Sequence, residues 1–595
     1  MSEDNRNWIL FTIVAAILFL AYQQFVIGPA EKQAQKSRAA AAAQASSPTA
    51  APAPLAPRLT RAQALALSPR IPIDTPALTG SLSLRGARID DLFLKDYHVE
   101  VSQSSPLVEL LRPEGMADAY FAQSGWAGAN LQGLPDAATL WTLTSGSTLS
   151  PGHPLTLTYA APSGLIFTRT IAVDDHYMFT ITDQVANRSA AAVSIAPYVS
   201  VQRQGLPVDR QRSRIVHEGA IGILGLGSAD LRQASYASWK KKGEEDWQST
   251  GGWLGITDKY WMTAFIPAQN QRIDAKIRVT PDPATGIDIY EATYSQQPLQ
   301  LGPGASATVQ TRLFAGAKTV PVLSQYQSGL GIPRFDDAVD WGLFWVLTKP
   351  IFWLLEQFHR AVGNFGVAIL MLTVVVRLIT FPLANKGFEM GVKMKKLQPQ
   401  LQELQKKFKS DPQAQQREMM ALYQREKVNP VTGCFPILLQ IPIFYALTKL
   451  FTVTIEMRHA PFFGWIHDLS ARDPTTFLNL FGLIPWDPAT TPLLGPTLGG
   501  ALHIGAWPLL YGGAMWLSQS MTPQTGIDPT QQLIFKLMPF FFTFILAQYS
   551  VGLLIYWTWS SLISIAQQYV LMRRFKVANP IDDFLARFAA KPEPT

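Results

Sequence analysis

Arg377 is the residue whose surroundings are least expected. It lies in the stretch AILMLTVVVRLITFPL, residues 368–383, which is otherwise almost entirely apolar. A charged side chain inside a bilayer costs at least roughly 2.5–3.5 kcal/mol, so such residues face a bundle interior or a water-filled cavity. The apolar segments that follow contain no Asp or Glu to neutralise it. We therefore expect the Arg377 guanidinium to meet water, lipid phosphate or a transient anionic partner.

Other polar residues lie at comparable depth in neighbouring apolar segments. Arg377 is nine residues before Lys386, or about 13 Å along a helix. Thr373 lies one turn before Arg377 on the same helical face, and Gln440 lies near the start of the next segment. The last segment carries a polar stripe at helical spacing, made of Ser560, Ser564, Gln567 and Gln568. These residues predict one shared polar volume, although hydrogen bonds that only join helices, each worth about 0.6 kcal/mol, explain the serines and glutamines equally well.

The sequence contains no motif typical of hydrolytic or nucleotide-driven catalysis. The patterns GxxxxGK[ST], HExxH and GxSxG are all absent. The single cysteine, Cys434, begins an apolar segment, where we interpret it as packing. A membrane-anchored enzyme is an alternative, whose candidate residues would be His153, His176, His217 and Glu218. We predict that the chain is not an enzyme and has no catalytic residue, metal ion or cofactor.

Apolar helices must position these polar residues. Hydrophobic residues make up 48% of the 595 residues and charged residues only 16%, a composition that indicates a membrane protein. Apolar runs of about 20 residues are long enough to cross a hydrocarbon core as helices. They predict six spans, at 8–27, 361–383, 434–455, 501–520, 533–550 and 551–572.

The remaining segments differ from these spans in composition and residue pattern. We interpret residues 1–28 as an uncleaved membrane anchor and residues 29–59 as a flexible Ala- and Pro-rich linker. From 60 to 335, short alternating stretches such as LIFTRTIAV predict many β-strands at sandwich spacing. Residues 336–360 combine aromatic residues with charges, which favours an amphipathic helix in the membrane surface. An amphipathic helix packed on the sandwich is the alternative.

Charge predicts the topology. Residues 384–433 contain ten Lys or Arg and five Asp or Glu, whereas residues 456–500 contain two and four. The positive-inside rule therefore places 384–433 and both termini in the cytoplasm, and the β domain outside. Helical spacing within 384–433 predicts a charged helical hairpin. Its basic residues could contact ribosomal RNA or lipid headgroups, or form only a solvated face; the candidates are Lys395, Lys396, Lys406 and Lys407.

Four runs in the helical part show a family resemblance: VVVRLITFPL, MMALYQREKVNPVTGCFPILLQIPIFYAL, WIHDLSARDP and GLLIYWTWSSLISIAQQ. With the anchor and the large β domain, they resemble the Gram-negative bacterial form of the YidC/Oxa/Alb family of membrane protein insertases. The resemblance implies a polytopic α-helical membrane protein of six spans, with a large periplasmic all-β supersandwich domain. The five-helix insertase core would cover 361–575 and a cytoplasmic tail 576–595.

The same resemblance implies a function. The protein would insert and help fold inner-membrane proteins without ATP hydrolysis, alone or with the Sec translocon. Family members hold a hydrated groove in the inner leaflet with a single arginine, to which Arg377 corresponds. The implied groove residues are Arg377, Thr373, Gln440, Trp557, Ser560, Ser564 and Gln567.

Two departures from the family's pattern stand out. The family often has tyrosine where Trp557 stands, and the loop at 479–500 is longer than in its best-known members.

The resemblance also implies partners and a location. These are nascent membrane proteins, the Sec translocon, the ribosome and the lipid bilayer of the bacterial inner membrane, with no small-molecule substrate. A channel or secondary transporter that uses Arg377 as an anion site is the alternative function. Against it, the later spans show no inverted repeat and no paired broken helices.

Overall fold

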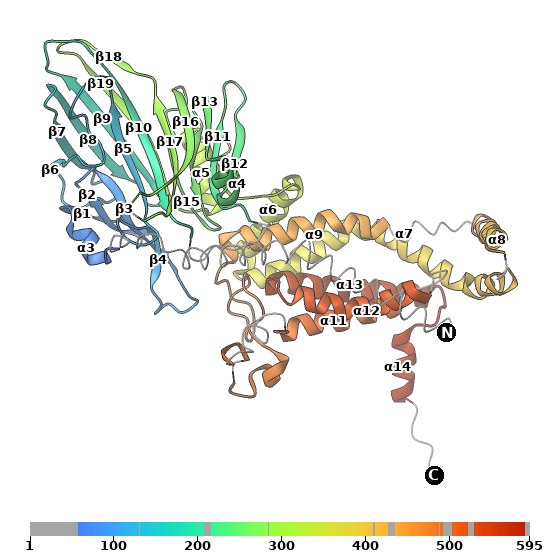
Figure 1. Ribbon diagram of the computed structural model, residues 1–595. Coiled ribbons are helices and arrows are strands. Elements are labelled where there is room, and N and C mark those ends of the chain that lie inside the picture. Colours follow the sequence, from blue (N-terminus) through green and yellow to red (C-terminus); the bar gives the residue numbers. More distant parts are fainter. Residues whose placement is uncertain are drawn as a thin grey trace, which may run out of the picture.

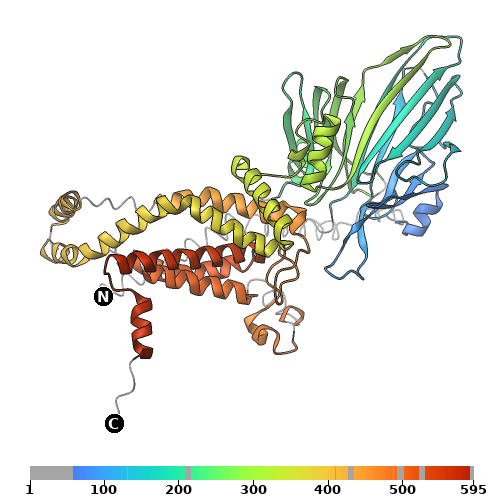
Figure 2. The same cartoon turned by 180° about the vertical axis from the view of Figure 1, so that it is seen from behind.

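A β domain and a bundle of helices make up the computed structural model (Figure 1). The β domain lies at one end of the bundle and a helical hairpin at the other, as Figure 2 also shows. The predicted anchor at 1–28 and nearly all of the linker at 29–59 fall outside the described residues. The structure describes residues 58–129, 131–207, 216–283, 285–408, 411–426, 435–486, 488–491, 502–521 and 529–589.

Two antiparallel sheets form the β domain. The ten-stranded sheet has the order β1-β2-β3-β5-β10-β17-β16-β13, with β4 paired to β3 and β18 paired to β10. Its strands are β1 Arg70–Asp74, β2 Leu78–Ser83, β3 Arg88–His98, β4 Leu107–Leu111, β5 Tyr120–Ala127, β10 Val193–Gln204, β13 Glu244–Thr250, β16 Arg272–Pro281, β17 Asp288–Gln296 and β18 Leu299–Leu301.

The nine-stranded sheet has the order β12-β11-β14-β15-β19-β9-β8-β7-β6. Its strands are β6 Thr142–Ser145, β7 Leu155–Ala160, β8 Leu165–Val173, β9 Met178–Asn187, β11 Gly219–Leu224, β12 Asp230–Ser235, β14 Trp253–Thr257, β15 Trp261–Pro267 and β19 Ser306–Ala317. The short helices of the domain are α3 Arg61–Ala66, α4 Tyr236–Lys242, α5 Val320–Leu330 and the 3₁₀ helix η2 Phe335–Ala338.

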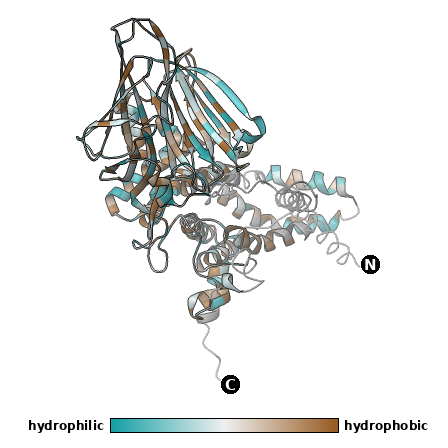
Figure 3. Cartoon of the chain, turned by 60° about the vertical axis from the view of Figure 1, so that its left-hand side comes forward, coloured by the Kyte–Doolittle hydropathy of each residue, from teal (hydrophilic) through white to brown (hydrophobic). Residues whose placement is uncertain are grey.

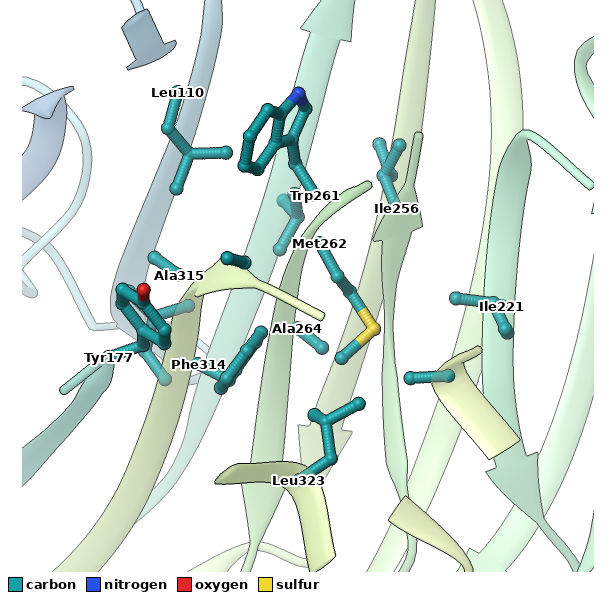
Figure 4. Packing of buried hydrophobic residues seen from close by; sticks show 14 of the residues in the cluster. Leu110, Tyr177, Ile221, Ile256, Trp261, Met262, Ala264, Phe314, Ala315 and Leu323 are labelled. Carbon is teal, nitrogen blue, oxygen red and sulfur yellow. The ribbon is translucent and has the colours of Figure 1, made fainter. Parts of the chain in front are cut away.

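Alternation of residue types explains why these segments form paired sheets. In β8, every second residue from Leu165 to Val173 is buried, and hydrophobic and hydrophilic bands alternate along the strands in Figure 3. A strand with this period presents one face to the core. Large side chains such as Trp261, Met262 and Phe314 fill the interior (Figure 4). The predicted large β domain is therefore confirmed.

The C-terminal region is helical. Its α-helices are α6 Trp345–Val362, α7 Phe365–Lys407, α8 Pro412–Arg425, α9 Phe435–Val453, α11 Ala506–Met521, α12 Pro529–Leu546, α13 Val551–Arg574 and α14 Pro580–Ala589. Short 3₁₀ helices follow α9, namely η4 Ile455–Met457, η5 Phe477–Gly482 and η6 Pro488–Thr490. In the bundle, α13 packs against both α7 and α11, α12 packs against α11, and α6 packs against α7 and α9.

The boundaries of α7 differ from those of the predicted span at 361–383. Gly363 ends α6 in a left-handed conformation, with φ 71°, and the Asn364 side chain then caps α7 by accepting from the Val367 N–H. Helix α7 continues through Pro382 to Lys407 without interruption. The apolar pattern marks where a helix would leave the bilayer, but no cap or glycine ends the helix there.

By length and composition, one helical segment among the described residues could cross a membrane, Phe365–Met394 in α7. Phe535–Leu546 in α12 is a shorter apolar helix. The count of six spans stays a prediction.

A polar junction joins the β domain to the bundle. Lys449 of α9 forms an ion pair with Asp340, which also accepts from the His217 backbone N–H at 2.9 Å. Glu456 of η4 accepts from the Val320 N–H at the start of α5 at 2.9 Å. These contacts fix the β domain on the end of α9.

Candidate functional site

Arg377 lies where α7 packs against α13. Its Nε donates to Ser560 Oγ at 2.7 Å, and its Nη2 contacts the same oxygen. The side chain is partly buried, and among the described residues no carboxylate lies within ion-pair distance of it. A neutral hydroxyl does not neutralise a guanidinium. The structure thus holds this cation in place while its charge stays uncompensated by the part of the chain described.

The polar stripe of α13 continues from this contact. Ser560 and Ser564 are both buried, and Ser564 Oγ donates to the Ser560 carbonyl at 3.0 Å. One turn before Ser560, the hydroxyl of fully buried Tyr556 faces Gln440 of α9 and Ser560. That hydroxyl forms no well-shaped hydrogen bond within the described residues. Arg377 of α7 therefore contacts Ser560 of α13, and Tyr556 of the same helix lies between this contact and Gln440 of α9.

Sequence reasoning missed Tyr556 as a member of this site. Its spacing of four residues from Ser560 puts it on the same face as the polar stripe. Extending the stripe by one turn toward the N-terminus of α13 would have found it.

Further along α13, the stripe contains polar atoms without partners. Gln568 Nε2 donates to Ser518 Oγ at 3.5 Å, whereas its Oε1 and the Nε2 of Gln567 are buried without a hydrogen-bond partner among the described residues. Buried amides are ordinarily hydrogen-bonded to protein or to water. This part of the helix interface is therefore polar and incompletely satisfied by protein groups.

Thr373 and Trp557 lie in packed surroundings. The Thr373 hydroxyl is fully buried and donates to the Ile369 carbonyl of its own helix at 2.7 Å. The Trp557 ring stacks on Phe444, with centroids 4.9 Å apart, and lies within 6.1 Å of the Tyr549 ring. Both residues flank the Arg377 contact, and their contact with a substrate stays a prediction.

The opposite side of α7 is apolar and exposed. Its large hydrophobic residues reach 65% exposure at Leu378 and 74% at Ile379. These side chains follow Arg377 directly in the sequence but face away from α13. Arg377 thus lies between a polar helix interface and a surface suited to lipid.

The lysines of the predicted hairpin lie on α7, beyond the apolar segment. Lys396 is exposed, with its Nζ 5.8 Å from the centre of the Phe575 ring. Lys406 and Lys407 are exposed near the end of α7. Lys395 lies in the same helix. The helices of the hairpin pack through an apolar cluster that contains Leu397, Leu401 and Leu422, whereas Lys396, Lys406 and Lys407 lie outside it.

The histidines of the alternative enzyme do not form one site in the described residues. His153 lies between β6 and β7, and His176 lies between β8 and β9. His217 precedes β11 and its Nε2 contacts the Ala220 carbonyl at 2.9 Å. No hydrogen bond between any two of them is found there.

Comparisons with known proteins relate both the β domain and the helical region to one protein family. Residues 70–354 match the family model of the YidC periplasmic domain, and residues 357–579 match that of the 60Kd inner membrane protein. A membrane protein insertase YidC from Caulobacter vibrioides (strain NA1000 / CB15N) is 53% identical over 618 residues, covering 99% of each chain. Another from Maricaulis maris (strain MCS10) is 43% identical over 595 residues, also covering 99% of each.

Among solved structures, an active YidC insertase with its first transmembrane domain resolved matches 84% of this chain and 92% of its own, at 17% identity and a TM-score of 0.34. The relatives, at up to 53% identity over nearly the full length, favour an insertase over a channel, a secondary transporter or an enzyme. The chain belongs to the YidC family of membrane protein insertases, inner-membrane proteins with a periplasmic β domain.

Proposed function

We propose that the protein inserts membrane proteins through a hydrated groove in the cytoplasmic half of the bilayer, with Arg377 at its centre. The observation that carries this proposal is the placement of Arg377 against Ser560 with no carboxylate in reach among the described residues. A cation held at this depth without a counter-ion attracts water and anionic groups. Both would ease the passage of a polar segment.

The unpartnered amide atoms of α13 support hydration of the same region. Gln567 Nε2, Gln568 Oε1 and the Tyr556 hydroxyl have no partner among the described residues, and buried polar groups in a polar site are commonly satisfied by water. A substrate's short polar flank would enter this volume. Its apolar segment would lie against the exposed hydrophobic side of α7, near Leu378 and Ile379.

The driving force for insertion would come from partition of the substrate. Apolar surface gains about 25 cal/mol per Å² on leaving water. An acidic flank would be drawn toward Arg377, and the membrane potential contributes about 2.3 kcal/mol per charge per 100 mV. No nucleotide is needed in this scheme.

The proposed topology follows from charge. Six spans would place both termini and the hairpin, residues 384–433, in the cytoplasm, with an anchor at 1–28 and a linker at 29–59. The hairpin would receive substrates from the ribosome, and the Sec translocon would cooperate on larger ones. Helix α6 would lie in the periplasmic membrane surface, since Trp345, Val346 and Trp353 are more than half exposed, at 56%, 62% and 62%.

Disulfide capture of a substrate tests the groove. In a chain carrying Cys434→Ser, Gln567→Cys would place a thiol on the polar stripe, and Leu562→Cys would place one on the outer side of the same helix, where Leu562 is 45% exposed. During insertion of a single-span substrate with one cysteine in its flank, we expect capture at 567 and little at 562. Equal capture at both positions, or capture at 562 alone, contradicts the groove.

A further inference from the structure

Residues 477–486, which we call the outer turn, carry an exposed apolar surface. Leu483 is 84% exposed and Leu480 53%. Four more large hydrophobic residues are exposed by 39–45%, namely Phe477, Phe481, Ile484 and Trp486. No charged residue occurs between 474 and 486. Contiguous apolar surfaces are uncommon on proteins that face water on all sides, and they mark contacts with a membrane or another molecule.

The outer turn is a defined structure that directs these side chains outward. Leu480 and Phe481 have φ angles of 51° and 59°, a region that bulky residues rarely adopt. Asn479 stabilises the turn, because its Oδ1 accepts from the Gly482 N–H at 2.9 Å and its Nδ2 donates to the Trp486 carbonyl at 3.1 Å. A strained conformation held by specific hydrogen bonds is typical of a functional segment.

Asp473 fixes the base of this loop to the bundle. Its buried carboxylate accepts from Trp465 Nε1 at 3.2 Å, from Thr475 Oγ1 at 2.7 Å and from the backbone N–H of Trp507 at 2.8 Å. Trp507 lies in the first turn of α11, so Asp473 ties the loop to the N-terminus of that helix. The outer turn is therefore held at a fixed level relative to α11.

The outer turn lies near the end of the bundle that faces the β domain. In Figures 1 and 2, the loop before α11, drawn in orange, projects sideways from the bundle at this end instead of continuing along the helix axes. The outer faces of α11 and α12 are also apolar and exposed, with Trp516 at 58% and Phe540 at 63%. The outer turn and these helix faces are thus all apolar and exposed, and the turn lies toward the end of the bundle that bears the β domain.

We propose that the outer turn inserts into the periplasmic leaflet and anchors the bundle laterally in lipid. Trp and other aromatic residues favour the boundary between acyl chains and headgroups, and Leu483 and Ile484 would reach into the acyl region. Because residues 474–486 include no Lys or Arg, the interaction does not depend on anionic headgroups. The proposal is independent of the groove and gives a role to the first part of the long loop at 479–500; residues 487 and 492–500 of that loop lie outside the described part of the chain.

Spin-label accessibility in full-length protein tests the depth of the outer turn. In the Cys434→Ser chain, one label replaces Leu483 and a control label replaces Ala190, which is exposed in the turn between β9 and β10. The proteins are reconstituted in phosphatidylcholine alone and with phosphatidylglycerol. We expect oxygen to relax the label at 483 more than a water-soluble nickel chelate does, and the reverse at 190. Both lipid mixtures should give the same order.

Three results would overturn the proposal. The nickel chelate could be the stronger relaxant at 483, which means that the turn lies in water. The order could reverse without anionic lipid, which means headgroup binding. Dipolar coupling between labels that disappears on dilution with unlabelled protein means that a second copy covers the turn. A label at Ile484 on the same turn must repeat the result, so that a distortion at one position is recognised.

Discussion

Glu456 should make the junction between the β domain and the bundle weaken as the pH rises. Glu456 is half-buried beside the start of α5, and burial raises the pKa of its carboxyl from the usual 4.5 to about 7. Its Oε1 accepts from Val320, whereas its Oε2 has no partner among the described residues. The protonated form is therefore the one that the closed junction favours.

The sign and size follow from linkage. A group whose pKa is higher in the closed state binds its proton more tightly there, so its contribution to closing is complete below pH 4.5. That contribution falls as the pH rises and levels off above about 7. The difference between a pKa of 4.5 in the open state and about 7 in the closed state corresponds to about 3 kcal/mol. Raising the pH through this range should therefore favour opening of the junction by roughly a hundredfold. His217 acts in the opposite direction, because burial lowers its pKa and closing then weakens as the pH falls.

Hydrogen exchange at the amide of Val320 and along α5 measures this opening. After correction for the intrinsic pH dependence of exchange, protection should fall between pH 5 and pH 8 in the wild type. Glu456→Gln keeps a side-chain oxygen that can accept from the Val320 N–H but cannot ionise. The difference in protection between the wild type and this variant therefore separates the effect of Glu456 from that of His217. Glu418→Gln, on the exposed face of α8, is the charge control and should behave as the wild type. A Glu456→Gln protein with the same pH dependence as the wild type would refute the reasoning.

Three further substitutions test the packing. Asp183→Asn should destabilise the β domain by about 3–5 kcal/mol in denaturant unfolding, because Asp183 accepts two hydrogen bonds of 2.7 Å from buried Arg169. Asp230→Asn, at an exposed position, is the control. Equal destabilisation by both substitutions would contradict a stabilising role for the buried ion pair. Gly512→Ala should lower the melting temperature, since its new methyl would lie 2.2 Å from Thr543 Oγ1 and overpacking costs about 1–3 kcal/mol. The neighbouring Gly513→Ala meets nothing within 4 Å and gains helix propensity, so it should not lose stability, and an equal loss in both variants would contradict overpacking as the cause. Asp473→Ala should release the loop from α11 and speed its proteolysis, and unchanged cleavage would show that Asp473 is not its main attachment.

Local patterns predicted much of the fold. Strict alternation in segments such as β8 indicated the β domain, and helical spacing in α13 put Ser560 and Ser564 on one face. The unusual charge of Arg377 indicated a polar site, and the structure places Ser560 against it. These features depend on neighbours within a few turns or strand positions, which the sequence displays directly.

Contacts between distant segments could not be predicted in this way. Lys449 and Asp340 are 109 residues apart in the sequence, and Glu456 and Val320 are 136 apart. No periodicity relates such pairs, because their meeting depends on how the whole β domain docks on α9. The same reason explains why the stacking of Trp557 on Phe444 was not foreseen.

Insertion into proteoliposomes that contain this protein alone tests the central claim most directly. A small single-span substrate with an acidic outer flank is scored by its protease-protected fragment, for the wild type, Arg377→Lys and Arg377→Ala. Arg472→Ala, an exposed arginine bonded to Gln548 at 2.7 Å, is the control. If Arg377 supplies the charge of the groove, the wild type, Arg377→Lys and Arg472→Ala insert the substrate and Arg377→Ala does not. Equal insertion by all four proteins would contradict the role of Arg377.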